Sequence, residues 1–303
     1  MNWIADRPVT IGVATLGWVR LLVRQLRLYQ WAKNALLFIP LLAAHRLGDH
    51  VLWVRTLLAF LSFGLVASSV YVLNDLSDLE ADRRHPRKRF RPLASGELPA
   101  GVGKALVPTL LVTGAAVALQ LPREFGFLLA GYWLTTLGYS LGLKKRPILD
   151  VTLLAGLYTV RVYAGGAATG VPVSEWLASF AMFLFFSLAF IKRAAELVGA
   201  AEALPGRGYR PDDLAPVFSM GIASGYLAVL VLALYISSQD VRRLYAHPSW
   251  LWLLCPLVLY WLSDLWLHAR RGKVDDDPLL FALRDPSSWV VAALAAIVVW
   301  IGV

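Results

Sequence analysis

Acidic and amide side chains recur at helical spacing in the segment NDLSDLEAD, from Asn74 to Asp82. On an α-helix, which turns by about 100° per residue, four of these side chains fall within little more than a quarter of the surface. They are Asn74, Asp75, Asp78 and Asp82. Carboxylates this close repel one another unless a cation lies among them. Hard oxygen ligands suit Mg²⁺, which often shares carboxylates with substrate phosphates. The spacing therefore predicts that these four residues bind Mg²⁺ and, through it, a diphosphate.

Basic residues follow the acids immediately, since six of the nine residues from Arg83 to Arg91 are arginine or lysine. A solvated helix end whose acids pair with these arginines is therefore an alternative that spacing alone leaves open. We expect Lys88, Arg89 and Arg91 to bind substrate, because arginine offers a fork of donors to phosphate and lysine offers a point charge. Ordinary surface charge is the expectation for a second group: Arg83, Arg84, Arg207, Arg270 and Arg271.

The composition excludes an ordinary soluble protein. Hydrophobic residues make up 58% of the 303 residues and charged residues 16%, whereas about a quarter of a soluble domain is charged. Apolar runs of about 20 residues, enough to cross roughly 30 Å of hydrocarbon, lie near residues 53–75, 103–121, 125–143, 148–168, 175–192, 216–237 and 249–268. With two weaker segments, near 31–45 and 281–302, we expect an all-α membrane bundle of about nine transmembrane helices.

No linker or soluble appendage divides the chain, so we expect a single domain over residues 1–303. Residues 1–33 are expected to form an interfacial segment, because Arg20, Arg24 and Arg27 have helical spacing. The single cysteine, Cys255, lies in an apolar run. It excludes an intrachain disulfide and a cluster of thiolate ligands.

The basic residues also indicate an orientation. With a cytoplasmic N-terminus, most of them fall in the inner loops 76–102, 143–147, 193–215 and 269–280. The outer loops then hold only Arg46, Arg123, Arg242 and Arg243. The net charge of +9 thus belongs to one face. It indicates an anionic lipid or substrate, and no nucleic acid as a partner.

The acidic segment resembles the first aspartate-rich motif of the UbiA superfamily of intramembrane prenyltransferases. RPLASG, from Arg91 to Gly96, fits the same motif, and RLYQWAKN, from Arg27 to Asn34, resembles the stretch before their first helix. The resemblance implies the UbiA fold, an active site on the cytoplasmic side and a cap on that site formed by loop 76–102. One departure is clear. The aromatic prenyltransferases carry a second Asp-x-x-x-Asp motif, whereas here Asp150 is followed by Val151 to Leu154.

Four further motifs resemble the polyprenyl-phosphate phosphoribosyltransferases of this superfamily: YSLGLKKRPILD (139–150), RVYAGGAA (161–168), KRAAEL (192–197) and FALRD (281–285). The resemblance implies transfer of 5-phosphoribose from phosphoribosyl diphosphate to a long-chain polyprenyl phosphate, with Mg²⁺, in the bacterial cytoplasmic membrane. Asp75, Asp78 and Asp82 are then catalytic. The implied substrate-binding residues are Asn74, Lys33, Lys88, Arg89, Arg91, Tyr139, Lys144, Asp150, Arg161, Lys192 and Arg193. The sequence leaves open whether the protein forms a homo-oligomer.

Arg161 lies about 16 Å along a helix from Asp150 and on nearly the same face. That places it close to the middle of the bilayer, where a charge is costly and usually functional. A structural pairing with an acid such as Asp264 is the alternative. The small residues that follow, AGGAA, predict close helix packing.

Two other functions compete with phosphoribosyl transfer. A UbiA enzyme could move a prenyl group from prenyl diphosphate to an aromatic or other small acceptor, but the dense set of cations argues against it. A lipid-phosphate binder or transporter would have no use for acids at magnesium spacing. The acceptor phosphate is already ionised near neutral pH and needs no general base, so we expect His85 to order its loop.

Overall fold

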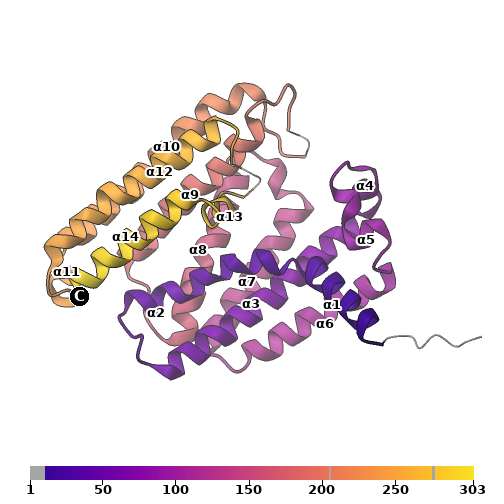
Figure 1. Cartoon of the computed structure of the whole chain (residues 1–303), viewed down its shortest axis with the longest axis horizontal. Helices are drawn as coiled ribbons and strands as arrows, with labels where there is room; N and C mark the ends of the chain where they lie inside the picture. Colours follow the sequence, from indigo (N-terminus) through magenta and orange to yellow (C-terminus); the bar gives the residue numbers. More distant parts are fainter. Residues whose placement is uncertain (1–10, 205, 275–276) are drawn as a thin grey trace, which may run out of the picture. The chain divides into compact units, whose positions relative to one another are not determined.

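The computed structural model describes residues 11–204, 206–274 and 277–303, and over these residues it contains helices and no strand (Figure 1). The predicted all-α class is therefore confirmed. Two compact units divide the chain: residues 1–32 with 60–120, and residues 33–59 with 121–303. We call them unit 1 and unit 2 and describe each by itself. The expected single domain stays a prediction.

Unit 1 holds the N-terminal helices and the acidic segment. Its elements are α1 (Ile11–Leu26), the start of the 3-10 helix η1 (Leu28–Phe38), α3 (His50–Ser77) from Phe60 onward, α4 (Leu79–Arg84), η2 (Lys88–Phe90), α5 (Pro92–Ser95) and α6 (Ala100–Ala118). Its core contains Val72, Leu93, Leu98 and Leu110. Residues 1–10 of the expected interfacial segment lie outside the described residues.

Small residues let the elements of unit 1 approach closely. Trp31 packs over Gly64, where a Cβ would lie 2.5 Å from the indole ring, and its Nε1 donates to Ser68 Oγ at 3.0 Å. Ser62 Oγ donates to the carbonyl of Gly114 at 2.8 Å and so joins α3 to α6.

Unit 2 contains the remaining helices. They are α2 (Ile39–Ala43), the start of α3, α7 (Arg123–Leu141), η3 (Leu143–Lys145), α8 (Leu149–Thr169), α9 (Glu175–Leu197), η4 (Pro211–Asp213), α10 (Leu214–Ser237), α11 (Gln239–Leu244), η5 (Pro248–Leu253), α12 (Leu254–Arg270), α13 (Pro278–Ala282) and α14 (Pro286–Gly302). α9 packs against both α8 and α10. Gly225 lies against Ser187, and Ser224 Oγ donates to the carbonyl of Phe183 at 2.9 Å.

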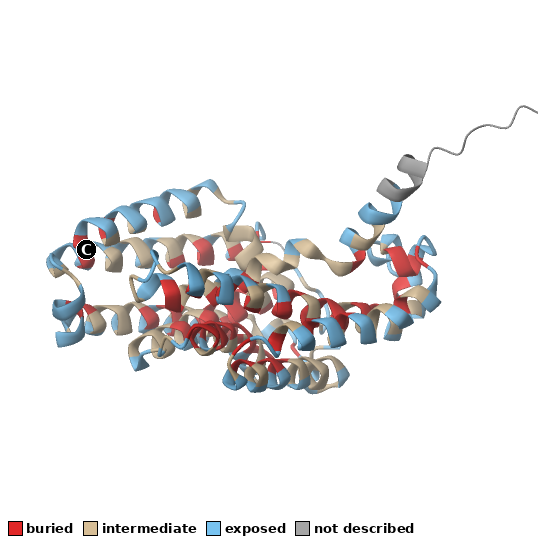
Figure 2. Ribbon diagram, turned by 90° about the horizontal axis from the view of Figure 1, so that it is seen from below, coloured by how far each residue is buried: buried red, intermediate tan, exposed pale blue. Residues whose placement is uncertain are grey.

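Five helical segments within the described residues have the length and hydropathy to cross a membrane: 50–77, 100–118, 175–197, 211–237 and 248–270. α14 is apolar but shorter. Exposed residues occur all along the helices and not only at their ends (Figure 2), and they include large apolar side chains such as Phe127 (76% exposed) and Trp300 (79%). Such surfaces suit a lipid environment.

The count of about nine spans stays a prediction. The weak segment near 31–45 is a 3-10 helix followed by the short α2, in which Pro40 occupies the first turn. Proline lacks the N–H that a continuous helix would use there.

The predicted close packing of AGGAA is confirmed at Gly165. A Cβ on this residue would overlap the backbone carbonyl of Leu37 in η1, so α8 and η1 touch through backbone atoms. Backbone cannot rotate away as a side chain can, and glycine is the residue that permits the contact.

We predict that Gly165→Ala lowers the melting temperature of the detergent-solubilised protein by several degrees, since overpacking of this kind costs about 1–3 kcal/mol. Gly131→Ala is the matched control, because Gly131 lies in α7 with no heavy atom within 4 Å of the position that a Cβ would take. Equal melting temperatures for the two variants would contradict the close contact.

Candidate functional site

The acidic residues lie where α3 passes into α4. Asp75 is in the last turn of α3, Asp78 stands between the helices with φ −96° and ψ 11°, and Asp82 is in α4. The single helix expected over residues 74–82 is therefore interrupted at Asp78. Ser77 Oγ donates to the carbonyl of Leu73 at 3.0 Å, a side-chain bond that often bends helices. Backbone bonds four residues apart continue across the break, from Asp78 N to Asn74 O at 2.9 Å and from Asp82 N to Asp78 O at 2.8 Å.

Two of the three acids are buried and share one arginine. Asp75 and Asp82 are only 3% and 2% exposed. Arg91 Nη1 lies 3.0 Å from Asp75 Oδ1 and 2.5 Å from Asp82 Oδ2. Arg27 Nη2 donates to Asp75 Oδ1 at 2.5 Å, and Gln25 Nε2 donates to Asp75 Oδ2 at 3.0 Å. The two carboxylates thus converge on one positive charge, as the arginine-pairing alternative expects.

The other members of the predicted set lie around this pair. Asp78 is exposed, and its carboxylate makes no hydrogen bond or ion pair with another described residue. Lys88 Nζ approaches Asp82 Oδ1 to 4.0 Å. Arg89 instead stacks on the ring of Phe90, with 4.8 Å to the centroid, and makes no contact with the acids in the described chain.

The donor chemistry of this acidic cluster fits Mg²⁺, although no three His, Cys, Asp or Glu side chains among the described residues are assembled as a metal site. Asp75 and Asp82 present hard carboxylate oxygens toward a common point, which Arg91 occupies with a cation. Asp78 has a carboxylate that no described protein group engages. These are the ligands that Mg²⁺ prefers. A bound ion would require Arg91 to give up at least one of its two acids.

His85 orders the basic loop, as predicted. Its Nδ1 accepts from the backbone N–H groups of Arg87 at 3.2 Å and Lys88 at 3.3 Å. Farther along, Arg24 Nη2 donates to the carbonyl of Phe90 at 2.9 Å, and Arg24 Nη1 pairs with Glu97 at 3.0 Å. The loop that carries Arg91 is therefore held at both ends.

Unit 2 contains a second group of charges around Asp150. Asp150 and Arg193 are fully buried, with Arg193 Nε 2.7 Å from Asp150 Oδ2. That N–H does not point at the oxygen as in a hydrogen bond, and Arg193 Nη2 has no hydrogen-bond partner within the described chain. Tyr139 OH donates to Asp150 Oδ1 at 2.7 Å. Arg207 Nη1 lies 3.3 Å from the same oxygen and donates to Tyr139 OH at 2.5 Å.

Further charges continue from this pair along α9. Glu196 pairs with Arg193 and lies 4.0 Å from Arg207 Nε. Lys33 pairs with Asp277. Lys192 lies near Lys33, Asp277 and Arg193, but no acid is within ion-pair distance of it in the described chain. We call the following eight residues the charged cluster: Lys33, Arg161, Lys192, Arg193, Arg207, Asp150, Glu196 and Asp277.

Arg161 is buried in α8, 4% exposed, and neutral groups hold it. Its Nε donates to Asn34 Oδ1 at 3.1 Å, its Nη2 donates to Tyr132 OH at 3.0 Å, and its Nη1 donates to the carbonyl of Leu157. Arg161 Cζ and Lys33 Nζ each lie 5.8 Å from the centroid of the Tyr158 ring. The alternative partner Asp264 is wrong, because that carboxylate contacts His268 Nδ1 at 3.4 Å and Ser287 Oγ at 3.4 Å.

The structure brings together most of the predicted substrate-binding residues of unit 2, with one exception. Tyr139, Asp150, Lys33, Lys192, Arg193 and Arg161 are members or direct neighbours of the charged cluster. The Lys144 side chain makes no hydrogen bond or ion pair with another described residue.

Arg207 and Asp277 were missed by the sequence reasoning. Arg207 was expected to be ordinary surface charge. Its sequence signal is the pair of glycines around it, Gly206 and Gly208, with φ of 71° and 74°. A side chain at Gly208 would also overlap the carbonyl of Lys145. Asp277 is the last of three aspartates before Pro278, and nothing in that run points to Lys33.

The loop between α9 and α10 therefore positions Arg207 against the cluster. Burial alone lowers the pKa of the Arg207 guanidinium, but Tyr139, Glu196 and Asp150 together raise it by more. The net pKa is therefore raised above its usual value, and the residue stays charged. Tyr209 follows two residues later and is 1% exposed. Burial raises the pKa of its hydroxyl, which accepts from Ile148 N at 3.0 Å. This contact ties the loop to the start of α8.

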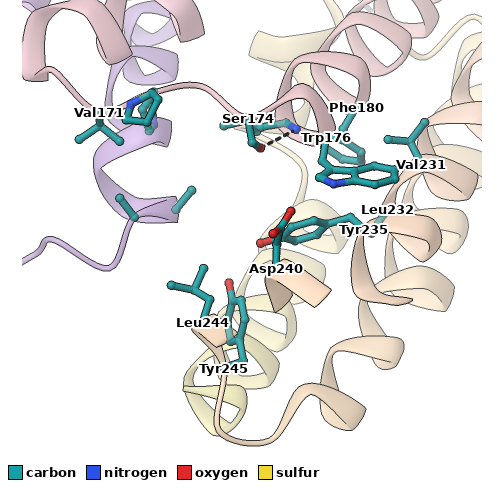
Figure 3. Close-up of a pocket in the computed structure, with 15 residues that line it drawn as sticks. Val171, Ser174, Trp176, Phe180, Val231, Leu232, Tyr235, Asp240, Leu244 and Tyr245 are labelled. Carbon is teal, nitrogen blue, oxygen red and sulfur yellow. Dashed lines mark hydrogen bonds between the residues drawn. The ribbon is translucent and has the colours of Figure 1, made fainter. Parts of the chain in front are cut away.

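A separate pocket of about 370 Å³ lies at the opposite end of α9 (Figure 3). Trp176 and Phe180 line it together with Tyr235, Asp240 and Tyr245. Trp176 precedes Arg193 by 17 residues, or about 26 Å of helix. The pocket is therefore remote from Arg193.

Comparison with known proteins identifies a family, solved structures with a similar fold and relatives of similar sequence. The model of the UbiA prenyltransferase family matches residues 35–284. A UbiA homologue from Archaeoglobus fulgidus, bound to DMAPP and Mg²⁺, aligns with a TM-score of 0.67 at 18% identity, over 92% of this chain and 99% of that one. This is a likeness of fold.

Three relatives have similar identity to this chain. Decaprenyl-phosphate phosphoribosyltransferase of Mycobacterium tuberculosis is 37% identical over 91% of this chain and 93% of its own. Nodulation protein NoeC of Azorhizobium caulinodans is 36% identical over 87% of each. Protein y4nM of Sinorhizobium fredii is 38% identical over 90% of this chain, which spans 54% of that protein's length. With the family model matching most of its length, the chain belongs to the UbiA prenyltransferase family.

Proposed function

We propose that this protein transfers 5-phosphoribose from phosphoribosyl diphosphate to a polyprenyl phosphate, giving polyprenyl-phosphoryl 5-phosphoribose and diphosphate. The observation that carries the proposal is the excess of cations in the charged cluster: five cations stand with three acids in the described part of unit 2. A prenyl transfer to a neutral acceptor involves one diphosphate. Phosphoribosyl transfer must hold a diphosphate, a 5-phosphate and a lipid phosphate, and so needs more positive charge.

The relatives support the same choice of reaction. The Mycobacterium tuberculosis relative is named for decaprenyl-phosphate phosphoribosyl transfer, and similarity to it extends over nearly the whole of both chains. Because the relative from Azorhizobium caulinodans is named for nodulation, the proposal concerns the transfer step and leaves the pathway that uses the product open.

The acidic cluster is the proposed site for the leaving diphosphate. Asp75, Asp78 and Asp82, with Asn74, would hold Mg²⁺, which when bound neutralises developing charge on the diphosphate. Arg91 then keeps one acid or turns to a phosphate oxygen, for which its guanidinium is suited. Lys88 lies next to this site and adds a further cation.

The charged cluster of unit 2, taken by itself, is a proposed binding site for phosphate groups. The buried Nη2 of Arg193 is a donor without a partner in the described chain, and Lys192 has no acid within ion-pair distance there, although Asp277 and Glu196 are near it. The lipid phosphate is ionised near neutral pH, so its oxygen can attack C1 of the ribose directly. The C1–O bond to diphosphate breaks as the new C1–O bond forms on the opposite face, with inversion. No side chain has to remove a proton.

We place this chemistry on the cytoplasmic side of a bacterial inner membrane. The support is the distribution of arginine and lysine among the expected loops. Labelled phosphoribosyl diphosphate, incubated with polyprenyl phosphate and membranes that contain the protein, tests the proposal. We expect ribose label in the organic phase. Transfer of a labelled prenyl group to an aromatic acceptor, with no ribose transfer, would replace it with the alternative.

We predict that Asp78→Asn lowers the rate of ribose transfer by about 10² or more, the scale of losing one preorganised electrostatic contact to the reacting group. Removal of Mg²⁺ with EDTA should abolish transfer in the wild type. Glu80→Gln is the matched control, since Glu80 is an exposed acid of the neighbouring turn that pairs only with Arg83 in the described chain. Wild-type activity in a folded Asp78→Asn variant would refute the metal assignment.

Arg207→Ala should raise the KM for phosphoribosyl diphosphate or for the lipid phosphate by about 10- to 10²-fold, because a hydrogen bond to a charged group is worth about 1.5–3 kcal/mol. Arg207→Lys should recover only part of the loss, since lysine lacks the guanidinium fork. Arg271→Ala serves as the control, being exposed and free of ion pairs within the described chain. If both alanine variants give the same kinetic constants, Arg207 is surface charge after all.

A further inference from the structure

Gln25, in the last turn of α1, is a buried uncharged residue beside the acidic cluster of unit 1, and the proposed reaction gives it no role. It is 1% exposed, and its side chain reaches Asp75, 50 positions farther along the chain. Nε2 donates to Asp75 Oδ2 at 3.0 Å, and Oε1 is buried without a hydrogen-bond partner in the described chain. Because an ionised carboxylate only accepts hydrogen bonds, the atom that faces Asp75 must be the amide nitrogen, and the unpaired atom must be the oxygen.

The backbone at the end of α1 is fixed by contacts with α3 and η1. The carbonyl of Leu26 accepts from Ser68 Oγ at 2.8 Å, and the same hydroxyl accepts from Trp31 Nε1 at 3.0 Å. Arg27 follows with a positive φ of 52°, which is uncommon outside glycine, and its Nη2 donates to Asp75 Oδ1. The junction between α1 and η1 thus presents two side chains to one carboxylate from a fixed position.

The two buried acids of the cluster are held unequally. Arg91 contacts both Asp75 and Asp82. Without that arginine, Asp75 keeps a hydrogen bond on each carboxylate oxygen, from Gln25 and Arg27. Asp82 then keeps, among the described residues, only one lysine, whose Nζ is 4.0 Å away. Asp75 is therefore the acid whose orientation is independent of Arg91, and it stays in place when that arginine gives up an acid to a bound ion.

The unpaired Oε1 of Gln25 lies close enough to the acidic cluster to share a water molecule with it. The oxygen and nitrogen of an amide group are about 2.3 Å apart, so this Oε1 is at most about 5.3 Å from Asp75 Oδ2. One water, hydrogen-bonded at about 2.8 Å to each of two acceptors, spans such a distance. Mg²⁺ keeps several of its waters when carboxylates bind it. These waters donate hydrogen bonds to acceptors of the surrounding protein.

We propose that Gln25 is a positioning residue of the metal site. Its Nε2 holds the carboxylate of Asp75 in place, and its Oε1 accepts a hydrogen bond from a water that Mg²⁺ carries. The proposal rests on the metal site of the proposed function and extends that site to a residue of α1, outside the acidic segment. A single amide meets both demands, because it offers a donor and an acceptor on one rigid group.

Metal binding by the detergent-solubilised protein tests the proposal without turnover. Gln25→Met keeps the unbranched shape of glutamine and removes both polar atoms. Gln120→Met is the matched control, because Gln120 is exposed just after α6 and its side chain makes no hydrogen bond with another described residue. Mn²⁺, which takes the same oxygen ligands as Mg²⁺, is titrated in the presence of inorganic diphosphate and followed by electron paramagnetic resonance.

We expect Gln25→Met to weaken Mn²⁺ binding by about 10- to 10²-fold, the usual effect of losing a contact behind a metal ligand. Gln120→Met should bind Mn²⁺ as the wild type does. Equal affinities in Gln25→Met and the wild type would overturn the proposal.

Melting temperatures distinguish positioning from a purely structural role. They are measured in EDTA and at one fixed concentration of Mn²⁺ with diphosphate, since a ligand that binds the folded state raises the melting temperature according to its affinity. Gln25→Met should lose most of the metal-dependent rise that the wild type shows. A variant that melts lower under both conditions, with the same rise as the wild type, would show a structural role only and overturn the proposal.

The same measurements separate this inference from the proposed function. A wild type that binds Mn²⁺ more tightly than Gln25→Met but transfers no ribose would refute the reaction and keep the role of Gln25. Ribose transfer by a wild type whose Mn²⁺ affinity equals that of Gln25→Met would keep the reaction and refute that role. A wild type that binds no Mn²⁺ would refute both the role of Gln25 and the metal assignment.

Discussion

The fully buried contact between Asp150 and Arg193 is the interaction on which unit 2 depends. Removing two charges from water costs several kcal/mol per ion, and close geometry and further polar contacts must recover that cost. Tyr139 and Arg207 contact Asp150, and Glu196 pairs with Arg193, whose Nη2 has no hydrogen-bond partner in the described chain. Each of these side chains comes from a different place along the chain. The pair therefore fixes how the end of α7, the start of α8, the end of α9 and the following loop must meet.

The same constraint explains why glycine is needed in the loop after α9. Arg207 reaches Asp150 only if the loop lies directly on the backbone of residue 145, and Gly208 permits that approach. The acidic cluster of unit 1 is governed by a related rule. Two nearby buried carboxylates cannot both stay ionised without a cation, and Arg91 supplies one. Either an arginine or a metal ion with its diphosphate can neutralise the two carboxylates. The arginine-pairing alternative and metal binding are therefore compatible.

The sequence predicted the features that depend on local pattern. Apolar runs predicted the helical membrane fold, and AGGAA predicted the close approach at Gly165. The spacing of the acids predicted one face shared by Asn74, Asp75, Asp78 and Asp82, of which the structure joins Asp75 and Asp82 through Arg91. Features that depend on distant contacts were not predictable. Asp277 is 244 positions from Lys33 in the sequence, and no local signal joins them. Asp78 interrupts the expected helix with φ −96° and ψ 11°, a local departure from helical geometry that a simple helical projection does not include.

The excess of positive charge in the charged cluster has a thermodynamic consequence for the proposed reaction. Among the described residues, three acids offset only part of the repulsion among the five cations of the cluster, and this leaves unfavourable electrostatic energy there. Phosphate groups that bind there relieve this repulsion in addition to making their own contacts. Phosphate binding therefore offsets part of the unfavourable free energy of burying the cations. Asp150 has no second aspartate four residues later, since position 154 is leucine, and a carboxylate there would add a negative charge to the start of α8.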